Sequence, residues 1–78
     1  DSIGVLPEEQ GKGIGSRLLQ FLLDGARSRA CATAVLEVAA ANTAGRAFFE
    51  RCGFREVREL PNYYGRGLDG VLMVITLD

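Results

Sequence analysis

Three glycines stand at alternate positions, Gly11, Gly13 and Gly15, directly before a segment with helical periodicity. Glycine permits left-handed backbone angles and lets a ligand approach the backbone without meeting a Cβ. The first turn of a helix has unpaired N–H groups and a positive dipole end, which together bind phosphate. On the residues alone, this loop is either an anion site, to which Lys12 and Arg17 add positive charge, or a flexible turn that begins a helix.

Strand-like and helix-like segments alternate along the chain. Residues 3–6 form a short strand-like run that ends at Pro7. Residues 14–29 carry apolar side chains at helical spacing, which predicts an amphipathic helix. Residues 33–39 are apolar and contain β-branched side chains, so they predict a buried strand. A strand, a helix and a further strand in this order favour a parallel crossover.

A second helix is expected after the buried strand. Asn42 and Thr43 are good N-caps, the helix runs to Cys52, and Gly53 favours the left-handed conformation that ends a helix. The inner face of this helix is expected to carry three apolar side chains, those of Ala44, Ala47 and Phe48.

Two further strands complete the pattern. Residues 54–60 and 71–77 are joined by a glycine-rich loop, residues 62–70, and are expected to pair antiparallel. The order strand stub, helix, strand, helix, strand, strand predicts an α/β fold with a mixed sheet and helices packed on it. No repeat or linker divides the 78 residues, so a single unit of marginal stability is expected.

Composition narrows the classes of function. The nine basic and ten acidic residues are scattered along the chain and leave a net charge of −1, which argues against a nucleic-acid partner. No apolar run reaches the ~18 residues that a membrane span needs. The chain has no histidine, so it cannot assemble Ser-His-Asp or Cys-His machinery by itself. Cys31 and Cys52 have no metal-site spacing, and reduced thiols in a cytoplasmic protein are expected.

The glycine loop matches one known phosphate-binding pattern better than two others. A Walker loop needs four residues between its first glycine and Gly-Lys-Ser/Thr, and the dinucleotide fingerprint needs glycine where Ser16 stands. The spacing Gln10-x-x-Gly13-x-Gly15 instead resembles the pyrophosphate loop of the GNAT N-acetyltransferases, usually written R/Q-x-x-G-x-G/A.

The resemblance continues in order along nearly the whole chain. It includes Ile3-Gly4-Val5-Leu6-Pro7, then Leu36-Glu37-Val38 with Asn42, then the helix-ending segment Phe48-Phe49-Glu50-Arg51-Cys52-Gly53-Phe54, and finally Asn62-Tyr63-Tyr64. The last of these resembles one branch, the ribosomal-protein alanine N-acetyltransferases and related N-terminal acetylases. The resemblance implies that residues 1–78 are the C-terminal, acetyl-CoA-binding part of one GNAT domain. The N-terminal strands and helices would then lie outside this chain, or a second copy would complete the domain in an oligomer.

The resemblance also implies which residues hold acetyl-CoA. The backbone of Ile3 and Val5 would pair with the pantetheine arm, and the Val5 N–H would donate to the thioester carbonyl oxygen. Asn42 would lie near the pantetheine, although helix capping explains this residue equally well. The loop would hold the diphosphate through Gln10, Gly11, Lys12, Gly13, Ile14, Gly15 and Ser16.

Glu37 is the one charge in the middle of an apolar strand. Such a carboxylate is costly unless it is paired, hydrogen-bonded or facing a wet cleft. By resemblance it is the candidate general base, and the alternative is a carboxylate paired at a strand edge. Phe49 stands where many family members have a tyrosine that protonates the leaving thiolate. Tyr63 or Tyr64 would replace it, unless water does or the thiolate leaves unassisted; the alternative is that both rings shield the final strand.

Three functions are open at this point. The first is an acetyl-CoA-dependent N-acetyltransferase acting on an amine, with a protein N-terminal α-amino group as the acceptor that the branch implies, and with no metal. The second is a catalytically silent CoA-binding or assembly half-domain, which the absent N-terminal half and Phe49 favour. The third is a binder of nucleotide phosphates, for which ATP would compete as well as CoA.

Overall fold

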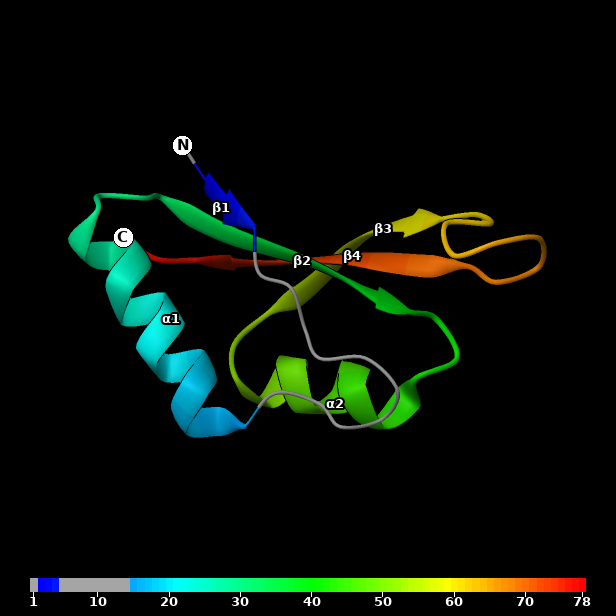
Figure 1. Ribbon diagram of the computed structural model, residues 1–78, viewed down its shortest axis with the longest axis horizontal. Coiled ribbons are helices and arrows are strands. Elements are labelled where there is room, and N and C mark those ends of the chain that lie inside the picture. Colours follow the sequence, from blue (N-terminus) through cyan, green and yellow to red (C-terminus); the bar gives the residue numbers. More distant parts are fainter. Residues whose placement is uncertain (1, 5–14) are drawn as a thin grey trace.

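The computed structural model describes residues 2–4 and 15–78. Strands and helices alternate as the sequence predicts, and the α/β fold class is confirmed (Figure 1). The elements are β1 (Ser2–Gly4), α1 (Ser16–Ser28), β2 (Thr33–Ala39), α2 (Thr43–Arg51), β3 (Arg55–Leu60) and β4 (Gly70–Thr76).

The four described strands form one mixed sheet in the order β1-β2-β4-β3. β1 and β2 are parallel and are connected through α1, which confirms the expected crossover. β4 lies antiparallel to both β2 and β3, so the two last strands pair as predicted. In the central pair, Leu36 lies opposite Met73 and Glu37 lies opposite Leu72. This register decides which side chains share a face of the sheet.

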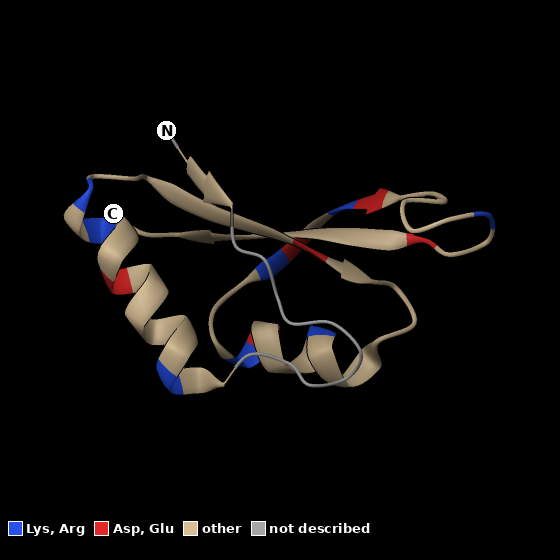
Figure 2. Cartoon of the chain, in the orientation of Figure 1, with Lys and Arg blue, Asp and Glu red and all other residues tan. Residues whose placement is uncertain are grey.

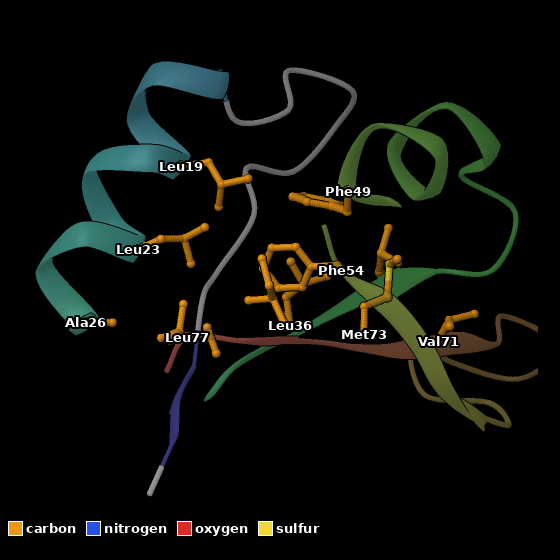
Figure 3. Close-up of a cluster of buried hydrophobic side chains, with 12 residues drawn as sticks. Leu19, Leu23, Ala26, Leu36, Phe49, Phe54, Val71, Met73 and Leu77 are labelled. Atoms are coloured by element: carbon orange, nitrogen blue, oxygen red, sulfur yellow. The ribbon is translucent and has the colours of Figure 1, made fainter. Parts of the chain in front are cut away.

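Both helices cover the same face of the sheet, and the core lies between them and the strands (Figures 1 and 3). Side chains alternate between the two faces of a strand, so every second residue of β2 and β4 enters this core. No described helix covers the other face, which is called the open face below. The strand residues in the core are Ala34, Leu36, Val38, Val71, Met73 and Ile75, and the helices add Leu19, Leu23, Ala26 and Phe49.

Helix α2 differs from the expectation in which side chains it buries. Ala44 is exposed, Phe48 is half-buried, and Phe49 is the buried residue, with 3% of its surface exposed. The Phe49 ring makes edge-on contacts with Phe48 and Phe54, at centroid distances of 5.2 and 5.8 Å. The helix ends as predicted, because Gly53 has a φ of 108° that a side chain would disfavour.

Helix α1 buries a narrower stripe than its apolar pattern predicts. Leu19, Leu23 and Ala26 face the core, whereas Leu18 and Leu22 are exposed, and 73% of the Phe21 surface is exposed. The exposed surface of α1 therefore includes an apolar stripe besides its charged and polar residues. Within residues 2–4 and 15–78, neither helix combines the length and apolarity that crossing a membrane requires.

Candidate functional site

Glu37 is the one charged residue of β2, a strand that is otherwise drawn tan in Figure 2. Its neighbours in sequence, Leu36 and Val38, point into the core, and alternation turns Glu37 the other way. The residue is half-buried beside Leu72. Within the described part of the chain, no hydrogen bond or ion pair of its carboxylate is present. The reading of Glu37 as a paired edge carboxylate therefore has no support among these residues.

Tyr63 and Tyr64 lie against Gly70 at the start of β4. Their rings contact each other edge-on, with centroids 4.9 Å apart. A Cβ at Gly70 would come within 3.2 Å of both Tyr63 Cβ and Tyr64 Cε2. Glycine at this position is thus what allows the two rings to approach the strand.

The two tyrosines and Glu37 share one face of the sheet. Gly70 lies directly opposite Ala39, so a Cβ at Gly70 would project to the same face as the Ala39 side chain. Ala39 is two residues from Glu37 on β2, a separation of about 7 Å along a strand. The structure therefore places on one face of the sheet Glu37 and the two tyrosines, which lie far apart in the sequence.

A shallow pocket of about 300 Å³ opens where β2 ends beside this loop. One wall is formed by Ala39, Ala40 and Ala41, whose small side chains leave room. The opposite wall is formed by the loop that follows the tyrosine pair, through Tyr64, Gly67, Leu68 and Asp69. The pocket is mostly apolar in its side chains, and it adjoins the open face that carries Glu37.

The loop between β3 and β4 is held by its own polar groups. Asn62 has a left-handed φ of 56°, and its side-chain Oδ1 accepts the Gly67 N–H at 2.7 Å. The Asp69 carboxylate accepts the Asn62 N–H at 2.8 Å. The Tyr64 N–H donates to the Leu68 carbonyl at 3.0 Å. These bonds close both ends of the loop, so Tyr63 and Tyr64 are presented from an ordered segment.

Asn42 is the N-cap of α2, as predicted. Its side-chain oxygen accepts the Gly45 N–H at 2.9 Å, which satisfies one of the unpaired amides of the first turn. Gly45 is constrained by this contact, since a Cβ there would collide with the Asn42 side chain. The capping role is present in the structure, and a contact with pantetheine stays a prediction.

The glycine loop is only partly within the described residues. Gly15 is the N-cap of α1, no described residue has an atom within 4 Å of the place a Cβ would occupy, and Ser16 is the first helical residue. Ile3 is half-buried in β1, where it pairs with Ala34. The first turn of α1 carries no acidic side chain, and the positive end of the helix dipole favours an anion. The other predicted cofactor residues, Val5, Gln10, Gly11, Lys12, Gly13 and Ile14, lie outside the described residues.

An ion pair holds the first turn of α2 to β3. The Arg46 guanidinium donates to both carboxylate oxygens of Glu56, through Nε at 2.7 Å and through Nη2 at 3.0 Å. The hydrogen bond from Arg46 is the main cause that lowers the pKa of Glu56 below its ordinary value, against partial burial. The same bond raises the pKa of Arg46. A third donor, Nη1, reaches the Ala40 carbonyl at 2.7 Å.

Sequence reasoning missed four residues of this region: Arg46, Glu56, Asp69 and Gly70. Arg46 and Glu56 lie ten positions apart on different elements, and no local spacing links them. In the sequence, Gly70 cannot be distinguished from the other glycines of the loop. Its role follows from the register of β4 against β2. The signal for Asp69 was weak, since an Asp beside glycines is common in turns.

Comparison with known proteins gives the family. A model described as the Acetyltransferase (GNAT) family matches residues 1–54. The ribosomal protein bS18-alanine N-acetyltransferase of Escherichia coli strain K12 is 39% identical over 80 residues, which cover 97% of this chain and 53% of that protein. The chain therefore spans about half the length of the curated relatives it matches.

Two solved structures are similar to this chain. Ard1 from Thermoplasma volcanium superimposes with a TM-score of 0.87 at 24% identity, over 99% of this chain and 55% of that protein, which shows the fold. The structure of yncA from Salmonella typhimurium, with its cofactor acetyl-CoA, has a TM-score of 0.73 at 33% identity over 90% of this chain and 42% of that protein. The resemblance expected from the sequence is confirmed, and the chain belongs to the GNAT family of acetyltransferases.

Proposed function

We propose that the protein to which this chain belongs is an acetyl-CoA-dependent N-acetyltransferase whose acceptor is a polypeptide N-terminal α-amino group. The observation that carries the proposal is the placement of Glu37. It is a half-buried carboxylate on the open face of the sheet, and the tyrosine loop and a shallow pocket lie on the same side. The name of the E. coli relative, an alanine acetyltransferase of a ribosomal protein, supports the acceptor class.

The cofactor side of the proposal rests on the start of α1. Acetyl-CoA supplies a thioester, and its diphosphate needs several N–H donors in a small space. Gly15 and Ser16 begin α1 with no acidic side chain in the first turn, and no described residue fills the space beside Gly15, which fits an anion there. Gln10, Gly11, Lys12, Gly13 and Ile14 would complete this cradle.

Glu37 would act on the acceptor amine. Only a neutral amine attacks a thioester, and Glu37 accepts the proton that the nitrogen loses, directly or through a water. An α-amino group with a pKa near 8 is partly neutral at physiological pH, so a modest carboxylate base suffices. A lysine amine, with a pKa near 10.4, would demand a stronger base. The C–N bond forms as the C–S bond breaks, and the departing thiolate takes up a proton.

The donor of that proton is a tyrosine of the loop or a water. Phe49 cannot donate, and its burial in the core keeps its ring away from the open face. Tyr63 and Tyr64 both carry a hydroxyl and lie on the same face as Glu37. A thiol with a pKa near 8.5 is also a tolerable leaving group without assistance.

A second function is favoured by Phe49. A module that binds CoA but transfers nothing would need no acid at this position, and the core contacts of Phe49 fit a structural residue. Calorimetry with CoA, followed by a thiol-release assay with amine and peptide acceptors, separates the two functions. The enzyme is expected to bind CoA and to release thiol with N-terminal peptides. CoA binding without thiol release for any acceptor supports the module and contradicts the enzyme.

Gly13→Asp tests the binding of CoA at the glycine loop. It puts a side chain and a negative charge into the phosphate path, so CoA binding is expected to fall below detection while the helical CD signal of the protein is retained. Competition by ATP as strong as that by CoA would instead support a general nucleotide-phosphate site.

We also place the protein in the cytoplasm. Cys31 and Cys52 are both free in the structure and half-buried, which is typical of proteins in a reducing compartment. Fractionation of cells that express the tagged full-length protein tests this placement.

A further inference from the structure

Both backbone polar groups of Ala40 are hydrogen-bonded to other segments of the chain. Its N–H donates to the Asp69 carbonyl at 2.8 Å, and its carbonyl accepts from Arg46 Nη1 at 2.7 Å. Ala40 comes directly after β2 and lines the pocket. The backbone of this one residue therefore joins the end of β2 to the tyrosine loop through its N–H and to α2 through its carbonyl.

Arg46 is held in place by Glu56. The two bonds to the carboxylate oxygens, at 2.7 and 3.0 Å, use one edge of the guanidinium and fix its plane. The remaining Nη1 donor then points at the Ala40 carbonyl. A lysine has no such fork and could not make all three bonds from one position.

The other end of the connection reaches the two tyrosines. Asp69 accepts the Asn62 N–H through its carboxylate, and Asn62 precedes Tyr63 directly. Asn62 in turn accepts the Gly67 N–H. A displacement of Asp69 therefore moves both ends of the segment that carries Tyr63 and Tyr64.

We propose that Arg46 is a positioning residue for the acceptor side of the site. Through Ala40 and Asp69 it fixes the tyrosine loop beside the face that carries Glu37. The inference rests on the proposed function, because it assigns the loop to the acceptor and not to acetyl-CoA. The bonds of Arg46 are to Glu56 and to the Ala40 carbonyl, so it acts through Ala40 and Asp69.

A purely structural role is disfavoured by exposure. The side chains of Arg46 and Glu56 keep 31% and 28% of their surface exposed, and neither belongs to the core. Water competes for charges this exposed, so the pair contributes only modestly to folding even with two hydrogen bonds between its members. Loss of Arg46 is therefore expected to change where the loop lies more than whether the protein folds.

The test compares Arg46→Met with Arg51→Met in the full-length protein. Both variants remove one positive charge from α2, but Arg51 is an exposed residue at the far end of the helix. Arg46→Met is expected to raise the acceptor KM about tenfold and to leave the acetyl-CoA KM within twofold, because a displaced wall misplaces the acceptor. Glu56→Gln keeps Arg46 and one acceptor oxygen, so a smaller rise is expected. Arg51→Met is expected to match the parent.

Hydrogen exchange supplies a readout that needs no activity. In Arg46→Met without substrates, peptides covering residues 38–42 and 61–70 are expected to exchange about tenfold faster, because the Ala40 and Asn62 amides lose their fixed acceptors. Parental exchange and parental acceptor KM overturn the proposal, as does an equal rise in both KM values. If Arg46→Met does not fold, a parental acceptor KM in Glu56→Gln overturns it. A parent protein that transfers no acetyl group contradicts the proposed function, and with it the acceptor role given to Arg46.

Discussion

The Asp69 carboxylate accepts a 2.8 Å hydrogen bond from the backbone N–H of Asn62, at the opposite end of the loop that joins β3 to β4. This bond, together with the 2.8 Å bond from the Ala40 N–H to the Asp69 carbonyl, gives the loop one position relative to the end of β2. The tyrosine pair is thus carried by a segment that is hydrogen-bonded at both ends, and Tyr64 of this pair lines the pocket beside it.

Gly70→Ala tests the packing of the tyrosines on the sheet. The added Cβ would press on Tyr63 and Tyr64 from 3.2 Å, so both rings are expected to move. The net change in stability is expected to stay within about 1 kcal/mol, because alanine also restricts the unfolded chain. The chain has two tyrosines and no tryptophan, so its near-UV CD band reports on these rings, and a clear change is expected. Gly25→Ala is the control: its Cβ meets nothing within 4 Å, and the tyrosine band should stay unchanged.

Asn42 variants separate capping from cofactor contact. Asn42→Ala is expected to lose about 1 kcal/mol of stability, because the Gly45 N–H loses its acceptor. Asn42→Asp keeps a cap oxygen and is expected to fold like the parent. If the asparagine also contacts pantetheine, the aspartate variant raises the acetyl-CoA KM while its urea midpoint stays parental. A parental acetyl-CoA KM in Asn42→Asp would contradict the pantetheine contact and leave helix capping as the role of Asn42.

Stability should fall in acid through Glu56. The hydrogen bond from Arg46 holds the pKa of Glu56 below its ordinary value of 4.5, so the folded state binds this proton more weakly than the unfolded state. The contribution of the pair is therefore complete above pH 4.5 and is lost as the pH falls through the folded-state pKa. The free energy of unfolding in urea is measured for the parent and for Glu56→Gln at pH 7 and pH 3. The difference between the two proteins is expected to be larger at pH 7. An equal difference at both pH values would contradict this account.

Local pattern was sufficient for most of the elements. β2 spans Thr33–Ala39 as expected. A short, mostly apolar run that contains β-branched residues is typical of a buried strand. The expected inner face of α2, Ala44, Ala47 and Phe48, includes the exposed Ala44 and leaves out the buried Phe49, and the reason is physical. The side chains of Phe48 and Phe49 point about 100° apart, and nine residues with few apolar positions do not fix the phase of a helix.

The arrangement of the site depends on long-range register, which local pattern does not contain. Glu37 could be singled out as a charge in an apolar strand. Its position on the same face as Tyr63 follows only from the pairing of Ala39 with Gly70, residues 31 positions apart in the chain. The contacts of Arg46 with Glu56 and Ala40 likewise join separate elements.

The exposed outer side of α1 predicts self-association of this 78-residue chain. Leu18, Phe21 and Leu22 lie at spacings of three and four residues, so they form one exposed apolar stripe. Sedimentation at micromolar concentration is expected to show a dimer or larger species. Phe21→Glu is expected to shift the chain toward monomer without a loss of helical CD signal, because 73% of the Phe21 surface is exposed. A well-folded monomeric parent would contradict the expectation of an oligomer.

The most direct test of the account is the pH profile of kcat/KM for Glu37→Gln with a peptide N-terminus as acceptor. Loss of the base is expected to lower kcat/KM about 100-fold at pH 7. The deficit should shrink above pH ~8, where the α-amino group is already neutral. Glu59→Gln, which removes a carboxylate from β3, should match the parent at every pH. A Glu37→Gln variant that turns over like the parent across the whole pH range would contradict the assignment of Glu37 as the base.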